Sequence, residues 1–468
     1  MNIASLKSNL SKRLFAPVDA SSLVVFRMGF GLIMLWEVLR YWSHGWISRY
    51  FIEPTFFFKY YGFEWVQAWD GNGMYIHFVL LGILAICITV GFMYRLSALL
   101  FTLAFSYIFL LDQARYLNHF YLVILFSSIL IVLPAQRYFS IDALIKPQRR
   151  SETVPAWSIW LLRIQLEIIL IYAGLVKINY DWLHLQPLSM WLAERSDLPV
   201  VGVFFNEPWA IAIAAYGVIA LHLIGAPLLL WKKTRIYVFF IYFAFHLLNH
   251  FVFSIGIFPW FTLFATLLFF EPDWPKQLTR RLRARFKKLN TKNLAEFENS
   301  PRFTATQNFA QKRWVYAFLS LWLGLQIFVP LRHWLYPGDV SWTEEGHRFS
   351  WRMKLRSKQG LAVFYVTDFN TAKTVAVHPK DLLTRRQARK MPTRPDMILQ
   401  FAHYLRDDWA VKQGINQPIV NANVFASLNG RAPARLIDAS VDLAKVERNL
   451  VHADWILPLT VPLSEHYK

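Results

Sequence analysis

The sequence predicts a polytopic α-helical membrane protein of about nine transmembrane helices, followed by a soluble, β-rich C-terminal domain. Of the 468 residues, 55% are apolar and 17% aromatic, whereas only 17% are charged. Soluble domains carry about 25% charged residues. The apolar residues fall in long blocks, and a helix needs about 20 such residues to cross the hydrocarbon core. These observations exclude a disordered chain, a fibrous protein and a single soluble globular domain.

Nine apolar stretches are candidates for membrane spans. They lie near residues 21–42, 76–93, 95–112, 118–134, 157–176, 209–231, 235–252, 256–271 and 314–331. Several are short, so nine is a best count. Basic residues precede the first stretch, but no small-residue cleavage site follows it. We therefore expect a retained helix and not a removable signal peptide.

The net charge of +20 is concentrated between the apolar stretches. Basic residues gather in 137–150, in the turn at 232–235 and in 272–313, where eleven Lys or Arg face three acidic residues. Cytoplasmic loops carry such an excess, so these segments are assigned to the cytoplasm. Membrane topology and lipid headgroups explain the charge, and we expect no nucleic-acid partner.

An odd number of spans places the C-terminal part on the opposite face. The predicted domains are a transmembrane catalytic domain of about eight spans at 1–275, a basic cytoplasmic connector at 276–312, a last transmembrane helix at 313–331 and an extracytoplasmic substrate-binding domain at 332–468. In the last domain, alternating stretches predict strands at Leu361–Phe369, Thr374–His378, Ile419–Leu428 and Ala434–Ile437. A helix is expected over Asp396–Val411, after Pro395. The pattern fits an α+β fold or a β-sandwich.

Ionisable side chains inside a bilayer cost about 2.5–3.5 kcal/mol each, so each needs a partner or a role. Arg163 and Glu167 are four residues apart on one predicted helix, and we expect them to form an ion pair. Arg27 and Glu37 are assigned structural roles, with partners on other spans. His222 is expected to form a hydrogen bond between helices.

Another set of polar residues meets at the outer leaflet in this topology. Its members are Asn118 and His119 at the start of the fourth span, Lys177 after the fifth, and His246, Asn249 and His250 at the end of the seventh. If these residues act independently, the lysine side chain extends to the membrane interface and the other residues cap helix ends. If they instead lie together, they predict a functional site in which burial lowers the pKa of the lysine and makes it a general base.

Metal binding is not predicted at this site. His246 and His250 are four residues apart, but no carboxylate partner is evident near them. The single cysteine, Cys87, excludes an intramolecular disulfide and any cysteine-based zinc or iron–sulfur site.

The stretch Ala173-Gly174-Leu175-Val176-Lys177-Ile178-Asn179-Tyr180-Asp181-Trp182 resembles the lysine motif of the vitamin K-dependent γ-glutamyl carboxylases. Further matches in the same order include Asn118-His119-Phe120-Tyr121-Leu122, Phe245-His246-Leu247-Leu248-Asn249 and Phe349-Ser350-Trp351-Arg352-Met353. The resemblance covers nearly the whole chain. Animal members join their two parts by a disulfide, which this chain cannot form. The compact length and missing disulfide suggest a bacterial inner-membrane protein with a periplasmic C-terminal domain; in a eukaryote, that domain would face the ER lumen.

The resemblance implies a carbon–carbon lyase that couples two reactions. Lys177 would deprotonate vitamin K hydroquinone, of the phylloquinol or menaquinol type, whose reaction with O₂ ends in the 2,3-epoxide. The strong base formed on the way would remove a γ-proton from a protein glutamate, and CO₂ would add to give γ-carboxyglutamate. His119 would act with Lys177, while Asn118, His246, Asn249 and His250 would bind the quinol. No biotin or ATP motif is visible, and neither cofactor nor a metal is expected.

Trp351, Arg352, Arg356 and Lys358 follow the last predicted span and are candidates for holding the glutamate of a protein or peptide substrate, since guanidinium groups match carboxylate geometry. The alternative is an ordinary strand with a solvated cationic face. Two other functions stay open. One is a quinol-oxidising membrane enzyme with another acceptor. The other is a transporter or scaffold in which Lys177 and the histidines relay protons.

Overall fold

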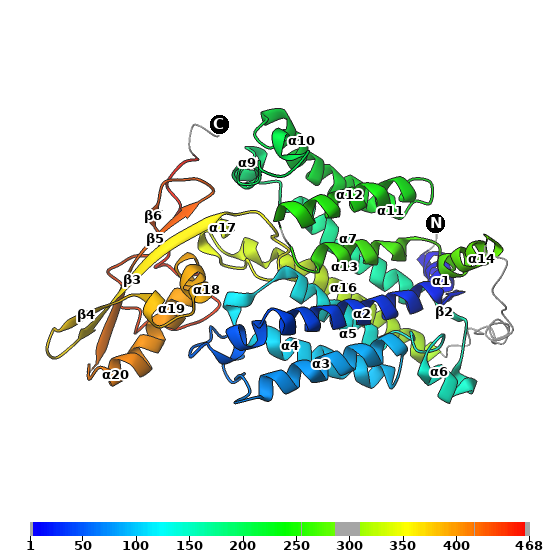
Figure 1. Ribbon diagram of the computed structural model, residues 1–468, viewed down its shortest axis with the longest axis horizontal. Coiled ribbons are helices and arrows are strands. Elements are labelled where there is room, and N and C mark those ends of the chain that lie inside the picture. The colour runs from blue at the N-terminus through cyan, green and yellow to red at the C-terminus, as the bar shows by residue number, and fades with distance from the viewer. Residues whose placement is uncertain (1–2, 254, 286–308, 416, 464–468) are drawn as a thin grey trace.

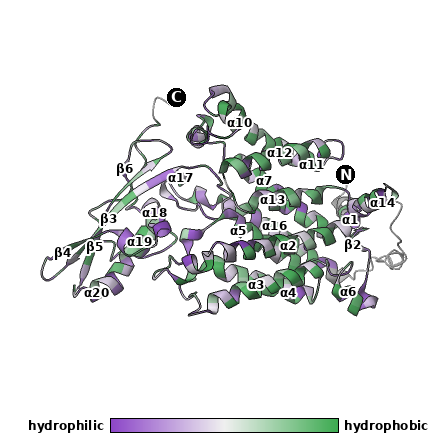
Figure 2. Cartoon of the chain, in the orientation of Figure 1, coloured by the Kyte–Doolittle hydropathy of each residue, from purple (hydrophilic) through white to green (hydrophobic). Residues whose placement is uncertain are grey.

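A computed structural model describes residues 3–253, 255–285, 309–415 and 417–463. Figure 1 shows an elongated body of helices, with the C-terminal sheet at one end. The helices α6 (Ile141–Ile145) and α14 (Trp274–Arg285) lie at the opposite end. Hydrophobic residues dominate the long helices, whereas the sheet end is mixed (Figure 2). The molecule is thus divided into an apolar part and a more polar part, as the sequence predicts.

Six described helical stretches are long and apolar enough to cross a membrane. They are α2 (Ser21–Ser43), α3 (Gly73–Val90), α7 (Trp157–Leu175), α10 to α11 (Pro208–Leu229), α12 (Arg235–Phe253) and Lys312–Leu335, most of which is α16 (Phe309–Leu331). The other three predicted spans are shorter apolar helices, namely α4 (Tyr94–Leu110), α5 (Asn118–Val132) and Phe258–Phe269, which begins with α13 (Phe258–Thr266). The count of nine spans is therefore not confirmed, although all nine stretches are helical.

Shorter elements lie before, between and after these helices. They are α1 (Ile3–Phe15), α8 (Tyr180–Leu183), α9 (Leu188–Ala193), α17 (Val340–Thr343), α18 (Arg385–Lys390) and the strands β1 (Pro17–Asp19) and β2 (Thr153–Pro155). The two strands pair antiparallel and tie the segment before α2 to the segment before α7. Most of the predicted connector 276–312 lies outside the described residues, and the domain boundaries stay a prediction.

A tight turn joins α3 to α4. Gly91 ends α3 with a φ of +69°, in the left-handed region that glycine adopts without penalty. The carboxylate of Asp142, on α6, accepts hydrogen bonds from the backbone N–H groups of Met93 (2.8 Å) and Tyr94 (2.9 Å). These bonds satisfy backbone donors that the start of α4 leaves without a partner. Asp142 thereby fixes α6 to the turn.

The buried charges of α2 have partners. The Arg27 guanidinium donates to the carbonyl oxygens of Ala135 (2.8 Å) and Phe139 (2.7 Å), beyond the end of α5. Glu37 forms an ion pair with Arg40 of its own helix at 2.6 Å. Arg27 therefore bridges separate parts of the bundle, whereas Glu37 does not pair with another span.

The expected Arg163–Glu167 ion pair is wrong. Arg163 instead donates to the carbonyl oxygens of Leu268 (2.7 Å) and Phe270 (2.8 Å). Those carbonyls follow α13, where the helix ends and leaves acceptors free. Both carboxylate oxygens of Glu167 are buried without a hydrogen-bond partner among the described residues.

The C-terminal part contains a four-stranded antiparallel sheet in the order β4-β3-β5-β6. Its strands are β3 (Lys358–Asp368), β4 (Thr374–Val377), β5 (Pro418–Leu428) and β6 (Ala434–Arg435). The long central pair runs from Lys358 opposite Leu428 to Asp368 opposite Pro418. The four predicted strands are thus confirmed, with small differences at their ends.

One face of this sheet is covered by α19 (Pro395–Tyr404). Phe364 of β3 is fully buried, and its ring lies edge-on to that of Phe401, with 4.9 Å between centroids. The predicted helix over Asp396–Val411 is confirmed as α19 followed by a π-helical turn (Leu405–Trp409) and α20 (Ala410–Lys412). Because the described residues there form one sheet with helices against it, the fold is α+β and the β-sandwich alternative is wrong.

Buried ion pairing holds the sheet to the helical body. Asp181, on α8, receives two hydrogen bonds of 2.7 Å from the guanidinium of Arg431 and one of 2.7 Å from Asn429. Both charged side chains are less than 10% exposed. Since Asp181 lies four residues after Lys177, this contact sets the sheet against the segment that carries the lysine.

Candidate functional site

Lys177 lies two residues beyond Leu175, the last residue of the α7 span, in the turn that leads to α8. Asn179 starts α8 by accepting a hydrogen bond from the N–H of Trp182 (3.1 Å). Lys177 Nζ donates to the carbonyl oxygen of Ala173 at 2.8 Å and lies 5.2 Å from the centroid of the Trp182 ring. The residue is 5% exposed. The amine is therefore buried and does not extend to the interface.

The surroundings of this amine favour its neutral form. Burial lowers the pKa of Lys177 from 10.5 to about 7, because the ammonium loses hydration that a single carbonyl does not replace. No carboxylate of the described residues forms an ion pair with it. Near neutral pH the amine is therefore able to accept a proton from an acidic hydroxyl group.

His222 interacts electrostatically with this lysine, and it is not among the site residues that the sequence predicts. It belongs to a π-helical turn (Leu221–Gly225) that packs closely on α7, where a Cβ on Gly174 would lie 3.0 Å from the His222 Cβ. Its ring interacts electrostatically with Lys177 and His246. Its Nδ1 bonds to the carbonyl oxygen of Val218 at 2.8 Å, one turn back. The expected bond between helices is therefore wrong.

His246 and His119 continue this cluster. Both ring nitrogens of His246 are buried without a hydrogen-bond partner among the described residues. The ring stacks on Tyr242, with centroids 6.0 Å apart, and contacts Phe258 at 6.4 Å. Phe258 also contacts the ring of His119, at 6.0 Å. An unpaired buried imidazole is costly unless a ligand completes its hydrogen bonds, so His246 is available to a polar substrate group.

Asn118 connects this cluster to the segment before β3. Its side-chain oxygen accepts a hydrogen bond from the Tyr116 hydroxyl at 2.9 Å. The same hydroxyl accepts a hydrogen bond from the backbone N–H of Phe349 at 2.7 Å. The start of α5 is thus tied to the C-terminal part of the chain through one tyrosine.

Asn249 and His250 lie further along α12. His250 packs against the ring of Trp260, with 5.3 Å between centroids, and its Nδ1 is buried without a hydrogen-bond partner in the described part of the chain. No hydrogen bond or ion pair of the described residues joins either side chain to Lys177. The structure therefore links Lys177 to His222, and His222 in turn to His246, by electrostatic interaction. No such link to these two residues is found in the described part of the chain.

Trp351 is fully buried in the helical body and not on a strand. Its ring stacks on that of Tyr121 of α5, with centroids 5.0 Å apart and planes inclined by 29°. Phe349 contacts the same tyrosine at 4.9 Å. The segment before β3 therefore packs on α5 at Tyr121, which lies two residues after His119 in the sequence.

The three predicted substrate-binding cations follow this insertion. Arg356 forms an ion pair with Glu344 at 2.8 Å, and Lys358 lies 3.9 Å from the same carboxylate. Arg352 donates to the Ser341 hydroxyl at 3.3 Å. The side chains of Arg356 and Lys358 are 15% and 2% exposed. The alternative of a solvated cationic strand face is therefore wrong for these two.

More cations join them from a distant part of the chain. Lys390 and Arg394 interact electrostatically with Arg356. They reach the start of β3 because Gly360 has no side chain: a Cβ there would lie 2.8 Å from the carbonyl oxygen of Pro392. Sequence reasoning missed both residues, since nothing in the local pattern indicates which basic residues of a soluble domain become buried.

The cationic cluster is short of negative charge. Burial, aided by neighbouring guanidinium groups, lowers the pKa values of Lys358 and Lys390 to about 7. Burial likewise lowers the pKa of Arg394 to about 10. Glu344 is the carboxylate that contacts both Arg356 and Lys358. Such a group of poorly hydrated cations favours an incoming carboxylate.

Comparison with known proteins identifies both parts of the chain. Residues 15–274 match the family of the HTTM domain, and residues 311–461 match the lumenal domain of vitamin K-dependent gamma-carboxylase. No solved structure gives a significant match. Within the described residues, no group of three or more His, Cys, Asp or Glu side chains is placed to hold a metal ion.

Proposed function

Because the chain belongs to the vitamin K-dependent gamma-carboxylase family, we propose that it is an integral membrane enzyme that oxidises vitamin K hydroquinone and carboxylates protein glutamate. Hydroquinone, O₂, CO₂ and a glutamate residue are consumed, and the 2,3-epoxide, γ-carboxyglutamate and water are formed. One oxygen atom of O₂ enters the epoxide and the other leaves as water. Neither biotin nor ATP takes part in this scheme.

The buried amine of Lys177 carries the proposal. Its pKa of about 7 and the absence of an ion-pair partner in the described residues allow it to take the proton of a phenolic hydroxyl. A lysine with the ordinary pKa of 10.5 would be protonated at neutral pH and unable to do so. Lys177 is therefore proposed as the general base for the hydroquinone.

The neighbouring polar groups are proposed to bind the hydroquinone. His246 has two ring nitrogens free to bond a hydroxyl or carbonyl oxygen, and His119 shares the Phe258 contact with it. Asn118 and His119 begin α5, and the aromatic rings around the cluster are proposed to pack against the naphthoquinone ring. His222 is proposed as a further residue of this site, because its charge interacts with that of Lys177.

The cationic cluster is proposed to hold the substrate glutamate. Arg356 and Lys358 share one carboxylate, Glu344, and a substrate carboxylate would balance the remaining charge. Trp351, which precedes these cations in the chain, stacks on Tyr121 of α5. We place the sheet domain on the periplasmic face of a bacterial inner membrane, opposite the basic end.

The test is an assay in detergent with reduced vitamin K, labelled bicarbonate and a glutamate-containing peptide. Lys177→Ala and Lys177→Arg are both expected to abolish epoxide formation and label incorporation, because arginine keeps the charge but does not lose its proton. The matched control is Lys233→Ala, an exposed lysine in the turn before α12. Normal epoxide formation by folded Lys177→Arg would refute the assignment of the base.

The glutamate site is tested separately by Arg356→Ala, with Arg356→Lys as the conservative variant. Hydrogen bonds to charged groups contribute about 1.5–3 kcal/mol, so Arg356→Ala is expected to raise the peptide KM roughly 10- to 100-fold. The hydroquinone KM should change much less. Equal changes in the two KM values would argue against this role. Epoxide without labelled product, in wild-type protein, would indicate a quinol oxidase with another acceptor.

A further inference from the structure

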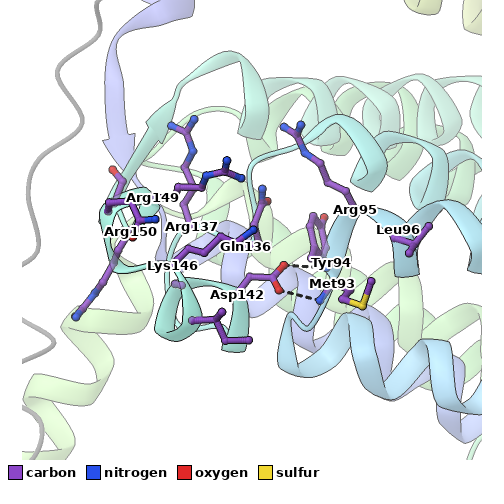
Figure 3. Close-up of a pocket in the computed structure, with 14 residues that line it drawn as sticks. Met93, Tyr94, Arg95, Leu96, Gln136, Arg137, Asp142, Lys146, Arg149 and Arg150 are labelled. Carbon is purple, nitrogen blue, oxygen red and sulfur yellow. Dashed lines mark hydrogen bonds between the residues drawn. The ribbon is translucent and has the colours of Figure 1, made fainter.

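A cavity of about 790 Å³ is lined in part by α6, which lies at the end of the bundle opposite the sheet (Figure 1). Its walls are the turn between α3 and α4, the segment after α5, α6 and the residues that follow α6 (Figure 3). Neither the base nor the cationic cluster of the proposed reaction lines it. This cavity is therefore separate from the proposed active site.

The lining of the cavity is strongly basic. Five of its residues are cationic, namely Arg95, Arg137, Lys146, Arg149 and Arg150. Asp142 is the acidic residue of the lining, and both of its oxygens accept backbone hydrogen bonds at the start of α4 (Figure 3). No ion pair of the described residues involves Arg95, Lys146 or Arg149. The cavity is thus suited to an anion.

Apolar side chains continue from the cavity along the bundle. Leu96 lines the cavity and is 45% exposed, and Leu99, Leu100 and Leu103 of the same helix are 40%, 41% and 58% exposed. Their spacing places all four on one face of α4. A free phosphate would use only the basic lining, whereas a phospholipid would also place its acyl chains along this leucine face.

We propose that the cavity binds the phosphate headgroup of an acidic phospholipid, with the acyl chains lying on the outer face of α4. Basic pockets at the cytoplasmic ends of membrane helices recognise such headgroups. The assignment does not depend on the proposed enzymatic function. It predicts that lipid binding stabilises the junction of α4 and α6, which Asp142 holds together.

The experiment uses the purified full-length protein in a neutral detergent. Binding and thermal stabilisation are measured with phosphatidylglycerol, with phosphatidylcholine of the same chain length, and with glycerol phosphate, which lacks acyl chains. Phosphatidylglycerol is expected to bind at least tenfold more tightly than either of the others. Equal binding of the two lipids would overturn the headgroup assignment, and equal binding of glycerol phosphate would overturn the lipid assignment.

Charge-removing variants locate the site. Arg95→Gln, Lys146→Gln and Arg149→Gln change exposed side chains, and each is expected to weaken phosphatidylglycerol binding roughly fivefold at low salt. Lys233→Gln, an exposed residue in the α11–α12 turn outside this cavity, is the matched control and should stay within about twofold of wild type. Unchanged affinity in all three cavity variants, or an equal loss in the control, would refute the site.

Discussion

Replacing Lys177 by methionine should stabilise the protein, and more so in acid than in base. The pKa of the buried amine is about 7, against 10.5 for an ordinary lysine. Between these two pH values the unfolded chain binds the extra proton, so the free energy of unfolding rises with pH. Below pH 7 both states are protonated and the full cost of burying the ammonium is present.

The size of this effect follows from the two pKa values. Their difference of about 3.5 corresponds to about 5 kcal/mol of destabilisation at pH 6, and about 2 kcal/mol remains at pH 9. Lys177→Met removes the cost of burying the ammonium and keeps a side chain of similar length. The stabilisation is therefore expected to be about 3 kcal/mol larger at pH 6 than at pH 9, whatever the packing of the new side chain contributes at both.

Thermal unfolding of the detergent-solubilised protein at the two pH values measures this difference. Lys233→Met, at an exposed position, is the control for a loss of charge without burial. Equal stabilisation by Lys177→Met at pH 6 and pH 9 would mean that the amine is hydrated in the folded protein. The reasoning that makes it a general base would then be refuted.

The remaining predictions concern stability. Arg431→Met leaves the buried carboxylate of Asp181 without its ion-pair partner and should cost about 3–5 kcal/mol; a double-mutant cycle with Asp181→Asn should recover much of it, and additive losses would refute the pair. Gly91→Ala places an alanine at a φ of +69° and brings its Cβ to 2.7 Å from Arg27 Nη1. The left-handed backbone alone costs an alanine about 1–2 kcal/mol, and the close contact adds to this cost. Thermal unfolding should therefore show a loss of stability greater than that value. Trp351→Ala should cost about 3–5 kcal/mol by creating a cavity in the helical core; an unchanged melting temperature would place the ring outside that core.

The sequence was most informative where one physical rule dominated. Apolar length and alternation located the helices and the four strands, because burial against lipid or a sheet imposes a regular pattern. Predictions failed where contacts from distant parts of the chain compete with local ones. Helical spacing predicts an ion pair between Arg163 and Glu167, but the guanidinium instead donates to two carbonyl groups just beyond α13.

At the candidate site, too, some residues could be predicted from the sequence and others could not. Lys177 and His246 could be named from the sequence, since charged or polar residues near helix ends stand out in apolar surroundings. The sequence predicts only a structural role for His222, because a lone histidine in an apolar helix gives no sign of its neighbours. Its place beside Lys177 depends on Gly174, which lets two helices approach closely. Lys390 likewise depends on Gly360, through contacts between segments about 30 residues apart.

The segment from Phe349 to Arg356 gives the proposed coupling a physical basis. At its start, the Phe349 N–H donates to the Tyr116 hydroxyl, which donates to Asn118, and Trp351 stacks on Tyr121 of α5. At its end, Arg356 enters the cationic cluster. One short segment thus contacts both proposed substrate sites. A base strong enough to remove a γ-proton would be quenched by water, so the glutamate must lie close to the hydroquinone when that base forms. Buried contacts at both ends of this segment tie the two proposed sites to each other.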